Sequence, residues 1–288
     1  MPRAARPVRS GRADRASCLV SIRPTAVVLL LATAGPAFAG RAADASVTPS
    51  LVRRLPASGG GQEDARALDA EAGRALENGA APFTERADLV ARLERAARVS
   101  AGESRARLAL LWLRGIRWLL SSVPFDVTQR LEPYRSWLEA HDDIVVYSEP
   151  SGEWLIESDL IWRVHDEHRR ATAAEAIAWL AVENRLPGEC EGYVPCYASG
   201  LNRLEGEYLR RHPAGAHAAE ALETVHEALT NALDLLARPD GSDFLNPASD
   251  CGDLRASLVP LRNAIIGAPD GASSQAIIAA DRLLSMCP

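Results

Sequence analysis

The sequence predicts an all-α protein built of antiparallel helix pairs. Apolar residues recur at helical spacing through most of residues 62–286, and the breaks between these segments are short and carry Gly, Pro or Asn. A short motif also recurs, because Ala173–Ile177 returns 45 residues later as Ala218–Leu222, each copy after a pair of arginines. Since one helix pair cannot bury both of its apolar faces, units of this length stack into an α-solenoid or helical-repeat domain.

The folded part is expected to begin after a flexible leader at residues 40–61, which contains two prolines and three consecutive glycines. An N-terminal helical region at residues 62–142 follows, with helices predicted at 62–78, 84–100, 103–121 and 126–141. The third of these helices is apolar on nearly every side. We therefore expect it to be the buried hub of this region.

Residues 143–288 form the expected C-terminal helical-repeat region, which holds two disulfides. Its first segment, 143–156, combines β-branched residues with a Pro–Gly turn, so a small hairpin competes there with an extended crossing. We favour the crossing, followed directly by a helix. The helices predicted in this region span 153–168, 172–186, 196–212, 216–237, 249–266 and 273–286.

The first 39 residues have the order of an export signal. Six arginines precede an apolar core at residues 25–34, and Ala37-Phe38-Ala39 provides the small-residue cleavage pattern before Gly40. The apolar core is about half the length that a bilayer span needs. The sequence therefore predicts a signal peptide, a periplasmic or secreted protein, and no transmembrane segment after cleavage.

The charge of the chain excludes one class of partner. The formal net charge is −6, and it becomes −11 once the predicted signal peptide, with its six arginines and one aspartate, is removed. A strongly acidic chain is repelled by phosphate backbones. We therefore expect no nucleic acid partner.

Four cysteines remain after the predicted cleavage. An even number in an exported chain predicts disulfides before it predicts a metal site. Of the three possible pairings, we favour Cys190 with Cys196 and Cys251 with Cys287. The first closes a seven-residue ring and the second ties the last helix to the start of the helix before it. Loop-closure entropy gives about 2 kcal/mol for the short ring and about 4 kcal/mol for the long loop, so the second bond is the expected structural staple.

One segment resembles a known family. The run Glu207–Leu222 is similar to the turn between helices in tetratricopeptide-like proteins of the bacterial envelope, and a looser copy spans Trp162–Trp179. The match is carried by Tyr208, Leu209, His212, Pro213, Ala218 and Ala221. The resemblance implies helix pairs stacked as repeats and a protein or peptide partner. It supplies no catalytic residues.

Few residues suggest catalysis. His165 and His168 can share a helix face, but their spacing is not the i, i+4 spacing of zinc-binding helices, and a helix C-terminus explains them equally well. The spacings of His212, His217 and His226 follow from the turn between two helices. The chain has no Gly-rich phosphate loop, no Gly-x-Ser-x-Gly elbow and no Cys-x-x-Cys pair. We expect no cofactor and no metal.

The candidate binding residues lie on the loop closed by Cys190 and Cys196. This ring presents Glu189, Glu191, Tyr193 and Tyr197, and rigid tyrosines lose little entropy on binding. Six tryptophans between residues 112 and 179 indicate either a packed core or a ligand-lined groove. We therefore expect a non-catalytic protein- or peptide-binding module of the cell envelope. The alternative is a hydrolase-type enzyme that acts on envelope polymers in a cleft between the helical halves.

Overall fold

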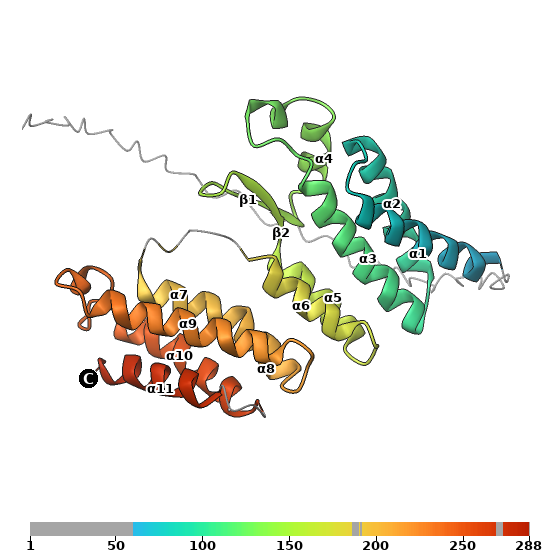
Figure 1. The fold of residues 1–288 in the computed structure, drawn as a ribbon. Coiled ribbons are helices and arrows are strands. Elements are labelled where there is room, and N and C mark those ends of the chain that lie inside the picture. The colour runs from blue at the N-terminus through green and yellow to red at the C-terminus, as the bar shows by residue number, and fades with distance from the viewer. Residues whose placement is uncertain (1–59, 186–189, 191, 269–272, 288) are drawn as a thin grey trace, which may run out of the picture. The chain divides into compact units, whose positions relative to one another are not determined.

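The computed structural model describes residues 60–185, 190, 192–268 and 273–287, which form an all-α fold with one two-stranded hairpin (Figure 1). The all-α prediction is therefore confirmed. The expected signal peptide and the leader up to residue 59 lie outside the described residues. None of the described helices combines the length and the apolar character that a membrane crossing requires.

The described residues begin with three helices, of which the third is the hub. They are α1 (Gly60–Asn78), α2 (Phe83–Val99) and α3 (Gly102–Leu120). α3 packs against α1, α2, β2, α5 and α6, so its nearly continuous apolar surface is used on several sides (Figure 1). Arg86 of α2 fixes the end of α3, because its guanidinium donates hydrogen bonds to the Trp118 carbonyl and to Ser121 Oγ. It also bonds the Gly79 carbonyl.

The helix predicted at 126–141 is wrong in its first half. The structure has a short 3-10 helix, η1 (Val127–Arg130), and then α4 (Tyr134–Ala140). Pro133 separates them, because proline lacks an N–H and disfavours helical backbone at the residue before it.

A small hairpin forms where the sequence left the choice open. β1 (Val145–Ser148) pairs antiparallel with β2 (Glu153–Ile156), with Val145 opposite Ile156. The expected crossing and the helix start at residue 153 are therefore wrong. Asn184 covers the outer edge of β2, since its side chain accepts from the Ile156 N–H at 3.1 Å and donates to the Ile156 carbonyl at 2.6 Å.

The remaining chain is helical, with one predicted helix divided in two. The predicted helix 196–212 is in fact α7 and α8, which meet at the non-helical Leu204. The helices after the hairpin are α5 (Ser158–His168), α6 (Ala174–Glu183), α7 (Val194–Arg203), α8 (Glu205–Arg211), α9 (Ala218–Leu236), α10 (Cys251–Ile266) and α11 (Ser273–Ser285).

Three apolar clusters hold these elements together. The first joins α1, α2 and α3, the second runs from α2 through the hairpin to α6, and the third joins α6 to α11. The second cluster draws residues from both sides of position 142, where the sequence analysis divides the two helical regions. Trp162 of α5 packs against the second and third clusters, which agrees with a core role for part of the tryptophan set.

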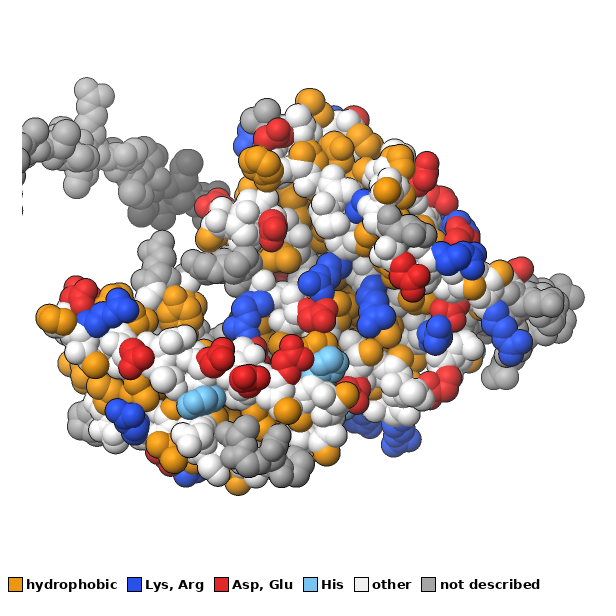
Figure 2. Space-filling view, viewed as in Figure 1, with side chains coloured by type: hydrophobic (Ala, Val, Ile, Leu, Met, Phe, Trp, Pro, Cys, Tyr) orange, Lys and Arg blue, Asp and Glu red, His pale blue; other side chains and the backbone are white. Residues whose placement is uncertain are grey.

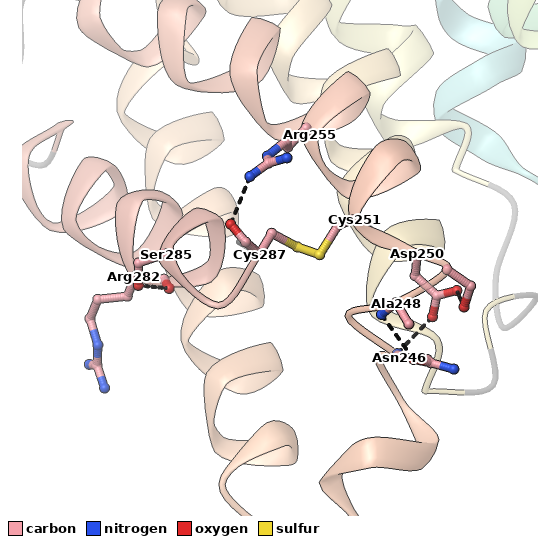
Figure 3. Close-up of a disulfide and its surroundings, with 9 residues drawn as sticks. Asn246, Ala248, Asp250, Cys251, Arg255, Arg282, Ser285 and Cys287 are labelled. Carbon is pink, nitrogen blue, oxygen red and sulfur yellow. Dashed lines mark hydrogen bonds between the residues drawn. A yellow bond between two sulfur atoms is a disulfide. The ribbon is translucent and has the colours of Figure 1, made fainter.

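Both predicted disulfides are present. Cys190 bonds Cys196 and Cys251 bonds Cys287, each with 5.4 Å between the Cα atoms. The second bond ties α11 to the first residue of α10, and Arg255 donates a hydrogen bond to the Cys287 carbonyl beside it (Figure 3). Cys251 and Cys287 belong to the third apolar cluster and are buried.

The two copies of the repeated motif occupy equivalent places. Each begins a helix, α6 or α9, and each of these helices follows another helix across a short turn, α5 or α8. The second residue of α3, Glu103, accepts a hydrogen bond from the N–H of Thr172, which lies two residues before α6. The second residue of α6, Glu175, accepts from the N–H of Ala216, which lies two residues before α9. The same carboxylate-to-turn contact thus links successive helix pairs.

Candidate functional site

A pocket of about 650 Å³ opens beside the short disulfide. It lies between the start of α5 and the pair α7 and α8, which run consecutively from Val194 to Arg211. Among the described residues it is lined by Ser158, Asp159, Trp162, Arg185, Cys190, Cys196, Tyr197, Ser199, Gly200, Asn202, Arg203, Leu204, Glu207, Arg210 and Arg211.

Arginines dominate the charge of this lining. Four arginines stand against two carboxylates, Asp159 and Glu207, although the whole chain carries a net negative charge. On the face shown in Figure 2, by comparison, basic and acidic side chains are intermixed. The lining therefore holds more arginines than carboxylates, although Arg185 and Arg211 also pair with Glu205 and Asp166, which lie outside it.

Two of the arginines are held rigidly by their neighbours. Arg210 donates to Asn202 Oδ1 at 2.9 Å and to Glu207 Oε2 at 2.6 Å. Arg211 donates to Glu207 Oε1 and stacks over the Trp162 ring, with its Cζ 5.0 Å from the ring centroid. Burial would raise the pKa of Glu207, but the hydrogen bonds from both arginines hold this pKa below its usual value. Glu207 therefore stays ionised and orders the wall of the pocket.

Arg203 differs from its neighbours. Its closest carboxylate oxygen, Asp159 Oδ1, is 3.9 Å away, and both side chains are largely exposed at 68% and 77%. Among the residues that the structure describes, no hydrogen bond satisfies its guanidinium. An exposed pair at this distance contributes little to stability. Arg203 is therefore free to accept a carboxylate ligand in bidentate geometry.

The fourth arginine pairs with a buried acid. Arg185 forms an ion pair with Glu205, whose side chain is 1% exposed. Burial raises the pKa of Glu205 above its ordinary value, against the opposing effect of Arg185. Glu205 Oε2 is buried and meets no hydrogen-bond partner in the described part of the chain. Arg185 thus compensates a buried acid as well as lining the pocket.

Of the four residues proposed on the stapled loop, the structure describes the two tyrosines, and they differ in their relation to the pocket. Tyr197 lines the pocket and is 42% exposed. Tyr193 is 38% exposed but does not line the pocket; desolvation and the negative charge of Asp250 raise the pKa of its hydroxyl. Glu189 and Glu191 lie outside the described residues.

The loop itself rests on the segment before α10. The Val194 N–H donates to the Phe244 carbonyl at 3.0 Å, and Gly192 lies against the Phe244 ring. A Cβ at Gly192 would come within 2.6 Å of that ring, and its φ of 91° favours glycine. The loop is therefore held by packing as well as by its disulfide.

The histidines group differently from the sequence expectation. His165 is 3% exposed, and its Nε2 lies 2.9 Å from Nε2 of His212, so one nitrogen carries the shared proton and the other accepts it. Burial lowers the pKa of both imidazoles. For His165, Arg211 adds to this shift and Asp166 opposes it. For His212, the His165 ring adds to it and Glu175 opposes it.

The other histidines do not join this pair. His168 lies in a separate open groove beside Glu103 and Arg105, and His217 stacks on Trp179 with 4.3 Å between ring centroids. Within the described ranges, no three His, Cys, Asp or Glu side chains are arranged to hold a metal ion. The pair of His165 and His212 joins α5 to the end of α8.

No sequence pattern predicts the arginines of the pocket. Arg185 follows α6, Arg203 ends α7, and Arg210 and Arg211 lie on α8. Arginine is the only basic residue apart from histidine in this chain, so their positions carried no local signal. Trp162 is the tryptophan that reaches the pocket, which fits the groove interpretation for this residue. The non-helical Leu204 separates Arg203 of α7 from Arg210 and Arg211 of α8, and all three side chains still line one pocket.

Comparisons of the chain with family models, with curated proteins and with solved structures find no match. The class of this protein is therefore defined by its own features, an all-α fold with two disulfides and an arginine-lined pocket at one of them.

Proposed function

We propose that this protein is an exported, non-catalytic binding module of the cell envelope, and that its ligand is a peptide segment carrying a carboxylate beside an apolar residue. The ligand binds in the pocket beside the short disulfide. The single observation that carries the proposal is the exposed Arg203, which no carboxylate of the described residues holds by a hydrogen bond, in a pocket where other arginines are already fixed.

The lining suits this ligand. Arg203 supplies a planar double donor for a carboxylate, which gives geometric selectivity as well as attraction. Trp162 and Tyr197 supply aromatic surface for an adjacent apolar side chain. Because Arg210, Arg211 and Glu207 are already tied to one another, binding immobilises few further side chains.

The fold supports the repeat part of the proposal. Glu103 and Glu175 make the same kind of hydrogen bond, to the turn that precedes α6 and to the turn that precedes α9, respectively. This equivalence, together with the repeated motif at the starts of α6 and α9, supports tetratricopeptide-like stacking of α2–α3, α5–α6 and α8–α9. The two disulfides support an oxidising compartment, and hence the proposed export.

A peptide array tests the proposal. The mature protein is incubated with randomised nonapeptides that contain either free or methyl-esterified carboxylates, and the affinities of bound sequences are measured by fluorescence polarisation. We expect binding that requires a free carboxylate. Arg203→Gln should weaken it about tenfold, which equals about 1.4 kcal/mol.

Arg114→Gln is the matched control, because Arg114 is an exposed arginine on α3 that does not line the pocket. It should leave the affinity unchanged. The proposal fails if no peptide binds more tightly than about 1 mM, if methyl esters bind as well as acids, or if both arginine variants weaken binding equally.

A further inference from the structure

The two disulfides of this protein have contrasting surroundings. Cys251 and Cys287 are 8% and 5% exposed and belong to the apolar core. Cys190 and Cys196 are both partly exposed and form part of the wall of the pocket of about 650 Å³. Thiol–disulfide exchange requires an attacking thiolate to reach a sulfur atom. In the folded protein, such an approach is open at the short disulfide and closed at the long one.

The two sulfurs of the short disulfide are not equivalent. Cys196 is the third residue of α7, which begins at Val194, whereas Cys190 precedes the helix in a turn. Side chains in a first helical turn lean toward the N-terminus, where the partial positive charge of the helix stabilises a thiolate. Cys196 is therefore the better leaving group.

The loop does not depend on the disulfide alone. The Val194 N–H bonds the Phe244 carbonyl, and Gly192 packs on the Phe244 ring. A ring of this size also contributes less loop-closure stabilisation than the loop closed by Cys251 and Cys287. Opening the short disulfide thus changes the pocket locally and leaves the helical core folded.

We propose that Cys190–Cys196 is a thiol–disulfide exchange site that accepts two electrons from a dithiol reductant. One thiolate of the reductant attacks Sγ of Cys190, the Cys190–Cys196 bond breaks, and Cys196 leaves as a thiolate. The second thiol of the reductant then attacks the mixed disulfide, releases Cys190 and closes the reductant's own disulfide. Two protons complete the pair of cysteine thiols. The inference is independent of the peptide proposal, since it concerns the sulfurs and needs no ligand.

Selective reduction of the native protein is the first test. The folded, oxidised protein is equilibrated without denaturant in a series of reduced and oxidised dithiothreitol mixtures, quenched with iodoacetamide and mapped by peptide mass spectrometry. We expect Cys190 and Cys196 to become labelled together while Cys251–Cys287 stays intact. Circular dichroism of the reduced sample should retain the helical signal. If both disulfides open together, or if the short one opens only when the helices melt, the inference is wrong.

The asymmetry of the sulfurs gives a second, independent readout. Glutathione, which has one thiol, should be trapped on Cys190 while iodoacetamide labels Cys196. In Cys190→Ser, the pH profile of alkylation should place the pKa of the Cys196 thiol below its ordinary value, and Cys196→Ser is the matched variant for Cys190. Glutathione found on Cys196, or an ordinary pKa for the Cys196 thiol, would overturn the assigned direction of attack.

Discussion

Removing the Tyr208 hydroxyl is expected to lower the free energy of unfolding clearly, because this hydroxyl joins three helices at one buried point. The Tyr208 side chain is 0% exposed. Its hydroxyl donates to Glu175 Oε1 of α6 at 2.9 Å and accepts from the His217 N–H, which precedes α9, at 3.2 Å. Burial raises the pKa of this hydroxyl, so it remains protonated and able to donate.

Tyr208→Phe removes only the oxygen and keeps the ring in place. It deletes one hydrogen bond to a charged acceptor, which contributes about 2 kcal/mol, and leaves the His217 N–H unsatisfied at a cost of about 1 kcal/mol. The expected loss in the free energy of unfolding is therefore about 3 kcal/mol. Urea denaturation followed by circular dichroism measures it as a lower midpoint with an unchanged slope.

Tyr197→Phe is the matched control, because the Tyr197 side chain is 42% exposed and its hydroxyl accepts, from the residues that the structure describes, a single 3.3 Å hydrogen bond, donated by Gly192. It should change the free energy of unfolding by less than about 0.5 kcal/mol. If Tyr208→Phe is no more costly than Tyr197→Phe, the reasoning about this buried contact between helix pairs is refuted.

Three other changes test single features of the fold. Arg86→Met should destabilise the protein by at least about 2 kcal/mol in urea, because it removes the side-chain donor to the Gly79 carbonyl and one of the two side-chain donors to the Trp118 carbonyl; a neutral effect would contradict this. Asn184→Leu should lower the free energy of unfolding by a similar amount, about 2 kcal/mol, because it leaves the N–H and the carbonyl of Ile156 without their side-chain partner. An unchanged urea midpoint would argue against it. Because the fold lowers the pKa of His165 and His212, the unfolded chain takes up more protons, so stability should fall as the pH drops below about 6.5. The slope should be smaller in His212→Gln, and an equal slope would contradict the role of the pair.

Most of the helical fold could be predicted from the sequence, because helical periodicity reports which face of a segment is buried. The same periodicity explains the main error. Val194, Ala198, Leu201, Glu205 and Tyr208 all follow one helical face, and all are buried, so the sequence indicates a single helix through Leu204. The break there depends on how α7 and α8 pack on other elements. Local sequence carries no signal for such packing.

The candidate site was only partly predictable. The disulfide pairing could be predicted from spacing, because Cys190 and Cys196 close a short ring and Cys251 and Cys287 lie near the ends of two consecutive helices. The pocket could not be predicted from the sequence. Its arginines come from the residue pair after α6, from α7 and from α8, and they converge only in three dimensions. Tyr193 is a related case, since Asp250, whose charge raises the pKa of the Tyr193 hydroxyl, is remote from it in sequence.

Photo-crosslinking tests the central claim, that the arginine-lined pocket beside the short disulfide is the ligand site. The best-binding acidic peptide from the array is synthesised with a benzophenone beside its carboxylate, irradiated with the mature protein, and the adducts are mapped by mass spectrometry. The account predicts adducts on the pocket lining, chiefly at Trp162, Tyr197 and the segment 199–204, which excess unlabelled peptide abolishes and Arg203→Gln reduces. Adducts confined to other surfaces, and competed there by the same unlabelled peptide, would contradict it.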